Sequence, residues 1–193
     1  TVAKNSGWGT AFGKRFNSSV EVKNFAVGGR SSKSWYNEKR LPAVLAYKPD
    51  YVLIQFGHND SHDPSYPEST DAETDYKDYL RQYIDDSRAI GAIPVLITPM
   101  YRRVFDELGN LEDNLVPYAT AMKSVAAEKG VLVIDLNAAS AELYLHLGPE
   151  GCLTLASSST DPTHFNETDA RAMAELVMEK LPVVEPSLEL FLK

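Results

Sequence analysis

Residues 51–60 read Tyr-Val-Leu-Ile-Gln-Phe-Gly-His-Asn-Asp, and this stretch decides the fold that the sequence predicts. Its first half is a nearly continuous apolar run between Pro49 and Gly57, which is typical of a strand buried on both faces of a sheet. Its second half is polar, and ligands of open α/β sheets bind just beyond the carboxyl ends of the strands. The Gly-His-Asn-Asp cluster therefore lies where chemistry is expected, or it forms only a turn, in which such residues are common.

Outward from this strand, strand-like and helix-like segments alternate along the chain with short connections. Further strands are predicted at residues 20–27, 93–98 and 131–136. Helices are predicted at residues 7–17, 34–45 (interrupted near Pro42), 76–90, 117–129, 138–147 and 167–181, the last capped by Asn166. Residues 61–74 form a surface loop, 101–114 a hairpin-like excursion and 182–193 a tail. The pattern predicts an α/β protein with a parallel sheet covered by helices on both faces, which is a three-layer α/β/α sandwich.

The length and composition are typical of one domain. The chain has 193 residues, of which 44% are hydrophobic, which is enough for one well-filled core. We therefore expect a single domain over residues 1–193. A sheet of this kind normally opens with a strand, whereas this chain opens on a loop that leads into a helix. We expect the first strand to precede Thr1, so that the chain is N-terminally truncated and a targeting signal upstream stays open.

Charge and cysteine content exclude several classes of function. The net charge of −8 and a pI near 5.0 argue against a nucleic-acid-binding surface, which needs a concentrated basic face. No apolar run approaches the roughly 20 residues that cross a bilayer, so no membrane partner is expected. Cys152 is the only cysteine, which excludes intrachain disulfides and cysteine-based zinc clusters. We expect it to be a buried apolar side chain.

Asp161 and His164 are three residues apart, just before the last predicted helix. This spacing lets one loop present an imidazole while the carboxylate reaches back to a ring nitrogen. A histidine held in this way serves as a general base, because the carboxylate fixes its tautomer and stabilises the imidazolium. The alternative is that Asp161 or Thr163 caps the helix and that His164 is an incidental surface residue.

Three motifs together resemble those of a known family. They are Gly-Gly-Arg-Ser at residues 28–31, Phe-Gly-His-Asn-Asp at 56–60 and Asp-x-Thr-His-Phe at 161–165. In this order and spacing they are similar to the SGNH (GDSL-type) hydrolases, and among these to the bacterial rhamnogalacturonan acetylesterases of carbohydrate esterase family 12. The resemblance covers nearly the whole chain and implies the flavodoxin-like fold of that family. Residues 1–4 resemble the segment that follows the family's nucleophile in the motif Gly-Asp-Ser-Thr.

The resemblance also implies roles for particular residues. Gly29 would supply a backbone N–H, and Asn59 a side-chain amide N–H, to an oxyanion hole. Asp161 and His164 would be two members of the catalytic triad, and the nucleophilic serine would directly precede Thr1. Asp169 departs from the motif, which more often has Gly there. We attach little weight to it, because an acidic residue is electrostatically acceptable near a helix N-terminus.

Several further side chains are candidates for binding substrate. Aromatic rings stack on sugars and arginines pair with carboxylates, so the candidates are Arg30, His58, Tyr66, Tyr101 and Arg102. The arginines, and Arg103 with them, are equally open to pairing with acidic residues of the protein surface. Histidines and aspartates at positions 58–63 could suggest a metal site, but histidines in a loop without helical spacing more often face solvent. We expect no metal.

The sequence thus predicts a serine esterase that deacetylates a plant cell-wall polysaccharide, in particular rhamnogalacturonan of pectin, without metal or organic cofactor. Its partner would be an acetylated polysaccharide or oligosaccharide. Secreted or periplasmic localisation is expected, because polymers do not enter cells. Two alternatives stay open: an esterase acting on acetylated xylan, a lipid ester or a thioester at the same site, and a non-catalytic carbohydrate-binding remnant on an inactivated scaffold.

Overall fold

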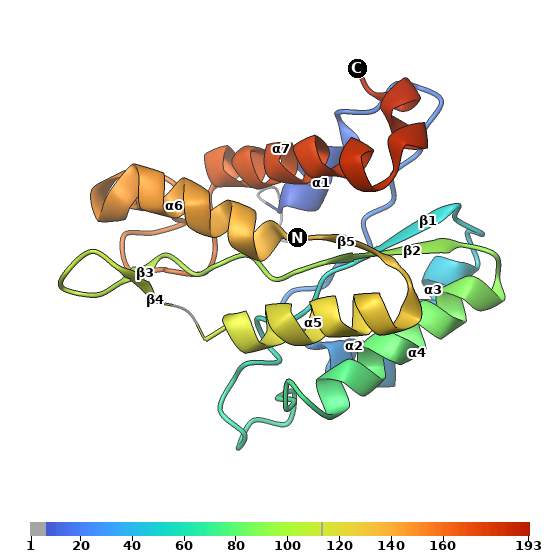
Figure 1. Cartoon of the computed structure of the whole chain (residues 1–193), viewed down its shortest axis with the longest axis horizontal. Helices are drawn as coiled ribbons and strands as arrows, with labels where there is room; N and C mark the ends of the chain where they lie inside the picture. Colours follow the sequence, from blue (N-terminus) through green and yellow to red (C-terminus); the bar gives the residue numbers. More distant parts are fainter. Residues whose placement is uncertain (1–6, 113) are drawn as a thin grey trace. The chain divides into compact units, whose positions relative to one another are not determined.

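The computed structural model describes residues 7–112 and 114–193, which form two compact units (Figure 1). The sheet unit consists of residues 29–99 and 114–135. The helical unit consists of the described residues of 1–28, 100–113 and 136–193. Residues 1–4, which resemble the segment after the family's nucleophile, lie outside the described residues.

The sheet unit contains a parallel sheet of three strands in the order β1-β2-β5. These strands are β1 (Tyr51–Ile54), β2 (Ile93–Ile97) and β5 (Leu132–Ile134). Leu53 lies opposite Val95, and Leu96 lies opposite Val133. β2 pairs on both edges and its last four residues are buried, as expected of a central strand with an apolar sequence. The prediction of an α/β protein with a central parallel sheet is confirmed.

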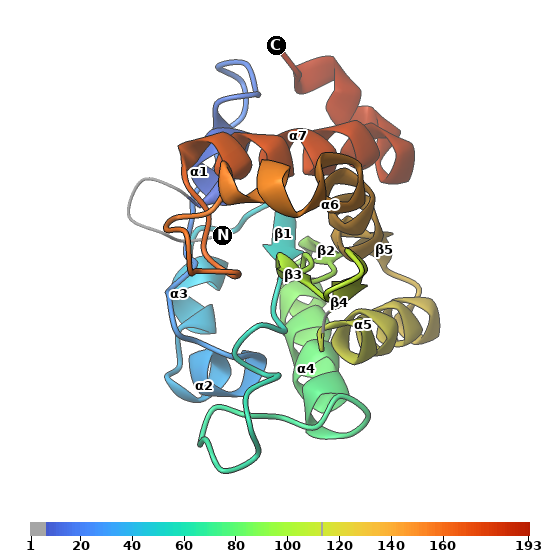
Figure 2. The same cartoon turned by 90° about the vertical axis from the view of Figure 1, so that its left-hand side faces the viewer.

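Four helices accompany this sheet: α2 (Ser32–Asn37), α3 (Leu41–Leu45), α4 (Asp75–Ala89) and α5 (Val116–Lys129). α4 packs against β2 and lies beside α2 and α5 (Figure 2). It buries Tyr76, Leu80, Tyr83 and Ile84, the positions that its helical spacing predicts. The predicted interruption of helix 34–45 lies earlier than Pro42, which sits in the first turn of α3, where proline is tolerated.

The helical unit contains α1 (Trp8–Gly13), α6 (Leu136–Leu153), α7 (Glu167–Val184), the 3₁₀ helix η1 (Pro186–Phe191) and a small hairpin of β3 (Val104–Phe105) and β4 (Leu111–Glu112). α7 packs against α1, α6 and η1. α6 kinks at Gly148, whose φ of +66° is a left-handed conformation. The predicted stop at this glycine is therefore real, but a further helical turn follows it. Cys152 is buried, as predicted.

Three local predictions of secondary structure differ from the structure. Residues 20–27 form no strand within the described part of the chain, and two of their N–H groups make local hydrogen bonds. The N–H of Val20 donates to the carbonyl of Asn17, and that of Ala26 donates to the side chain of Asn24. The helix predicted for residues 7–17 ends at Gly13, and residues 182–193 are an ordered end of α7 followed by η1 rather than a loose tail.

None of the helices in the described residues combines the length and the apolar character that crossing a lipid bilayer requires.

Candidate functional site

His164 and Asp161 are joined by a hydrogen bond in the loop before α7. The Nδ1 atom of the imidazole lies 3.0 Å from Oδ2 of Asp161. The same carboxylate also accepts hydrogen bonds from the backbone N–H groups of Thr163 and His164, at 2.9 and 2.8 Å, and from the hydroxyl of Ser157 at 2.8 Å. The carboxylate therefore binds other residues of the loop in which it lies. The structure brings Asp161 and His164 together, as their spacing in the sequence predicts.

The charge of Asp161 decides the tautomer of the neutral imidazole. Burial alone would raise the pKa of Asp161, but the backbone N–H groups of His164 and Thr163, the Ser157 hydroxyl and the His164 ring outweigh it and hold the pKa below its usual range. An ionised carboxylate only accepts hydrogen bonds, so Nδ1 of His164 carries the proton. Nε2 then holds the lone pair that a general base needs. The His164 side chain is 69% exposed within the described residues.

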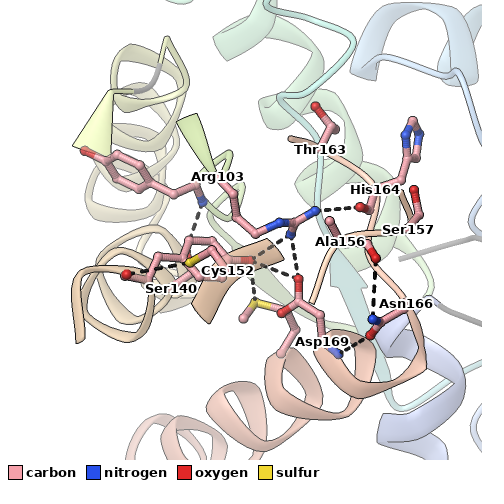
Figure 3. A network of polar contacts seen from close by, with 12 residues as sticks. Arg103, Ser140, Cys152, Ala156, Ser157, Thr163, His164, Asn166 and Asp169 are labelled. Atoms are coloured by element: carbon pink, nitrogen blue, oxygen red, sulfur yellow. Dashed lines mark hydrogen bonds and ion pairs between the residues drawn. The ribbon is translucent and has the colours of Figure 1, made fainter. Parts of the chain in front are cut away.

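Arg103 holds this loop from the buried side (Figure 3). Its backbone N–H donates to the carbonyl of Pro162 at 2.9 Å, and its Nη2 donates to the carbonyl of His164 at 2.5 Å. Its Nη1 donates to Oδ2 of Asp169 at 2.6 Å, and the exposures of the two paired side chains are 3% and 0%. Arg103 is thus occupied inside the protein by a buried carboxylate, whereas the sequence left it open to substrate or to acidic residues of the protein surface.

Asp169 is the residue that the sequence interpretation undervalued. It lies in the first turn of α7 and is fully buried beside Ala170 and Met173. Helical spacing from these apolar neighbours places residue 169 on the buried face. The sequence therefore shows an acidic residue on the apolar face of a predicted helix. A buried carboxylate there requires a positively charged partner.

The sheet unit positions the other predicted site residues through the buried carboxylate of Asp60. This carboxylate accepts hydrogen bonds from the backbone N–H of Ser32 at 3.0 Å, from the Ser32 hydroxyl, from the N–H of Gly57 at 2.9 Å and from the hydroxyl of Thr70 at 3.1 Å. Burial raises the pKa of Asp60. Asp60 therefore ties the turn after β1 to the first turn of α2.

Asn59 lies on the turn after β1, next to Asp60, and Gly29 lies on the turn that leads into α2. The amide nitrogen of Asn59 donates to the carbonyl of Arg30 at 3.1 Å, one residue beyond Gly29. Gly29 has a φ of +71°, a conformation that glycine adopts without strain, and Ser31 caps α2 immediately afterwards. The structure thus brings the segments of the two predicted oxyanion donors together within the sheet unit.

The predicted substrate-binding residues differ in their partners within the protein. Arg30 pairs with Glu38 at 2.9 Å, and Nε of Arg102 donates to the hydroxyl of Thr163 at 3.3 Å. The backbone N–H of Tyr101 donates to Ser140. The Tyr66 ring is exposed and packs edge-on against His62, and the carbonyl of His58 accepts from the Ser61 hydroxyl.

Positions 58–63 hold the histidines and aspartates that could suggest a metal site. Asp60 is engaged in the buried network above, and Nδ1 of His62 lies 2.8 Å from Glu68. Across the residues that the structure describes, no three His, Cys, Asp or Glu side chains gather as ligands for a metal ion.

Comparisons with known proteins point to one family. The model of the GDSL-like lipase/acylhydrolase family matches residues 1–169. The rhamnogalacturonan acetylesterase RhgT of Bacillus subtilis (strain 168) is 39% identical over 191 residues, a match that covers 92% of this chain and 81% of the relative.

Solved structures show the same fold. The crystal structure of protein YxiM from Bacillus subtilis superposes with a TM-score of 0.82 at 30% identity, covering 94% of this chain and 51% of that one, so this chain spans about half of that protein's length. An acetyl xylan esterase, AlAXEase, matches at a TM-score of 0.66 over 80% of this chain and 78% of its own. At 23% identity, this second likeness shows the fold alone.

Proposed function

This chain belongs to the GDSL-like lipase/acylhydrolase family, and from this premise we propose that it acts as a serine esterase that removes acetyl groups from rhamnogalacturonan. The observation that carries the proposal is the 3.0 Å contact between Nδ1 of His164 and Asp161, which leaves Nε2 available as a base. The rhamnogalacturonan acetylesterase RhgT, which matches most of both chains, supports the choice of substrate.

The proposed reaction is a two-step acyl transfer. The nucleophilic serine, which we assign to the position directly before Thr1, attacks the acetyl carbonyl while Nε2 of His164 takes its proton. His164 then gives this proton to the leaving sugar oxygen as the tetrahedral intermediate breaks down to an acetyl-enzyme. Water, deprotonated by the same nitrogen, releases acetate and restores the serine. No metal or organic cofactor takes part in these steps.

Two donors serve the oxyanion in this proposal. The backbone N–H of Gly29 and the amide N–H of Asn59 stabilise the negative charge that develops on the carbonyl oxygen. Donors that are already held in place cost no reorganisation during the reaction. The hydrogen bond from Asn59 to the Arg30 carbonyl supports this assignment, because it fixes the side chain of one donor to the segment of the other.

The substrate would be held by aromatic and basic side chains. We assign Tyr66, Tyr101 and His58 to contacts with sugar rings, and Arg30 and Arg102 to the carboxylates of galacturonate residues. We also propose that residues 1–193 belong to a single hydrolase domain, because one family model spans segments of both compact units. A polymeric substrate implies a secreted or periplasmic enzyme.

The test is the release of acetate by the full-length protein from acetylated rhamnogalacturonan, acetylated xylan and p-nitrophenyl acetate, beside a variant with alanine in place of the nucleophilic serine. We expect turnover of all three, the highest kcat/KM on rhamnogalacturonan and no turnover by the alanine variant. A higher kcat/KM on xylan would change the substrate to acetylated xylan. Binding of the polysaccharide without turnover of any ester would identify a carbohydrate-binding remnant and end the esterase proposal.

A further inference from the structure

Arg103, whose side chain is buried, attaches the loop that carries His164 to the body of the helical unit, beside the hydrogen bond from Arg102 to Thr163. Arg103 reaches the loop at three carbonyl groups: Pro162 through its backbone N–H at 2.9 Å, and His164 and Asp161 through Nη2 at 2.5 and 3.4 Å. Figure 3 shows its guanidinium group between this loop and Asp169. The carbonyl of His164 also accepts from the backbone N–H of Ser157 at 3.1 Å, but Ser157 lies in an exposed segment.

The other side of the guanidinium group is fixed by two helices. Nη1 donates to Oδ2 of Asp169 on α7 at 2.6 Å. The hydroxyl of Tyr144, on α6, lies 3.3 Å from the same carboxylate oxygen, and its ring centre is 5.7 Å from the guanidinium carbon. A guanidinium group is planar and rigid, so fixing one edge on Asp169 also fixes the direction of the edge that holds His164.

Stability alone is a poor explanation for this pair. Two charged side chains are removed from water, and Nε of Arg103 and Oδ1 of Asp169 have no hydrogen-bond partner among the described residues. Desolvation of such a pair often exceeds the gain from attraction, so apolar residues of similar volume would stabilise the fold as well or better. Buried groups that are left partly unsatisfied require another explanation, and a functional role is one of the few available.

We propose that Arg103, held in place by Asp169, is a positioning residue that sets the orientation of the His164 imidazole without touching the substrate. This inference is built on the proposed function, in which Nε2 of His164 must meet a serine hydroxyl. The hydrogen bonds that the Asp161 carboxylate accepts shape the loop internally, whereas those that Arg103 donates fix the loop to α6 and α7. A displacement of about 1 Å in a catalytic group costs on the order of 100-fold in rate.

The first experiment replaces both charges at once, because removing one alone would leave the other buried and unpaired. The double variant Arg103→Met, Asp169→Leu keeps an apolar filling of the space and is expected to fold, as judged by circular dichroism. We expect kcat on p-nitrophenyl acetate to fall about 10- to 100-fold, with KM within about twofold of wild type, because substrate contacts are untouched. Arg103→Lys keeps a positive charge but lacks the planar guanidinium group, so its kcat should lie between that of wild type and that of the double variant.

The matched control is Arg171→Met. Arg171 also lies on α7 and pairs with a carboxylate at 2.6 Å, that of Glu167, but both side chains are exposed. Among the described residues it forms no hydrogen bond or ion pair with the loop of residues 161–164, so its kcat is expected to equal that of wild type.

The second readout does not depend on catalysis. Ring ¹⁵N spectra of His164, assigned by comparison with a His164→Gln variant, report the tautomer directly. We expect a single Nδ1–H tautomer in wild type and in Arg171→Met, and averaged signals from a mobile ring in the double variant.

The outcomes separate this inference from the proposed function. A folded double variant with wild-type kcat, with a rise in KM alone, or with an unchanged ring signal overturns the positioning role. If the double variant does not fold, Arg103→Lys is judged by the same criteria, and failure of both to fold assigns the pair to the fold and overturns the role. If wild type hydrolyses no acetyl ester, the proposed function fails and the ring spectra alone decide the role of Arg103.

Discussion

The side-chain amide of Asn59 donates a hydrogen bond of 3.1 Å to the backbone carbonyl of Arg30. The two residues are far apart in the sequence, on the turn after β1 and on the turn before α2. Because this bond engages the Nδ2 atom itself, it fixes the direction of the amide that we assign to the oxyanion hole. Gly29, the other assigned donor, directly precedes the residue that accepts this bond.

Replacing Asn59 by alanine should reduce kcat about 100- to 1000-fold, because one oxyanion donor is lost. The fold should remain, since the Asp60 network around the turn is unchanged. The matched control is Asn37→Ala, which removes an exposed amide that donates to Tyr79 at 3.3 Å. Acetate release by Asn59→Ala within a few-fold of wild type would remove Asn59 from the role.

Asp60→Ala should destabilise the protein by roughly 3–5 kcal/mol. Four hydrogen bonds from Ser32, Gly57 and Thr70 end on this carboxylate, and each buried donor left without a partner costs about 1–3 kcal/mol, partly offset by relaxation. Urea unfolding measures the effect, with the exposed neighbour Asp63→Ala as the control. A loss for Asp60→Ala no larger than that for Asp63→Ala would show that the network does not stabilise the turn.

Gly57→Ala should cost clearly more stability than Gly91→Ala, although both glycines have positive φ. At Gly57 (φ +137°) an added Cβ would lie 2.7 Å from Cγ of Pro99, whereas at Gly91 (φ +85°) it would meet nothing within 4 Å. Backbone strain alone costs about 1–3 kcal/mol, and a steric clash in a packed site adds roughly 1–3 kcal/mol. Equal losses in thermal unfolding would contradict the close contact with Pro99.

Two carboxylates, the partly exposed Asp161 and the buried Asp169, should give stability opposite dependences on pH. The pKa of Asp161 lies below its usual range, so its contribution to stability is present above the unfolded pKa and is lost as pH falls through the folded value. Burial raises the pKa of Asp169 from 3.8 to about 6, in spite of the attraction of Arg103. Its protonated form is therefore favoured by folding, and the stability that this provides is lost as pH rises from about 4 through about 6.

The variant Asp169→Asn removes this second dependence. The free energy of unfolding of wild type relative to Asp169→Asn should decrease by up to about 3 kcal/mol between pH values of roughly 4 and 7, since one pKa unit corresponds to about 1.4 kcal/mol. Urea unfolding of both proteins across this range measures the difference. A constant difference would mean that Asp169 titrates at the same pH in the folded and unfolded states.

Most of the regular structure follows from local signals. The apolar runs of β1, β2 and β5, the Asn166 cap of α7 and the left-handed Gly130 at the end of α5 are each determined by a few neighbouring residues, and the structure has them where the sequence places them. The strand predicted at residues 20–27 does not form. A strand depends on a partner strand, and the alternation of apolar and polar residues within one segment does not supply a partner.

In the candidate site, too, local contacts were predictable from the sequence and contacts between distant residues were not. The contact between Asp161 and His164 was predictable because both residues belong to one short loop. The roles of Asp60 and Asp169 were not, because their partners are distant in the sequence: Ser32 is 28 positions away from Asp60, and Arg103 is 66 positions away from Asp169. Burial of a charge is decided by such long-range partners, which no local pattern identifies.

The most direct test of the proposed esterase site is a crystal structure of the full-length protein after reaction with diethyl p-nitrophenyl phosphate, which phosphorylates an activated serine and mimics the tetrahedral intermediate. We predict a phosphoryl group on the serine directly before Thr1, with its oxygen about 2.7–3.1 Å from the Gly29 nitrogen and the Asn59 amide, and His164 Nε2 within hydrogen-bond reach of the serine oxygen. A label on another residue, or a phosphoryl oxygen bonded to neither Gly29 nor Asn59, would contradict the proposed site.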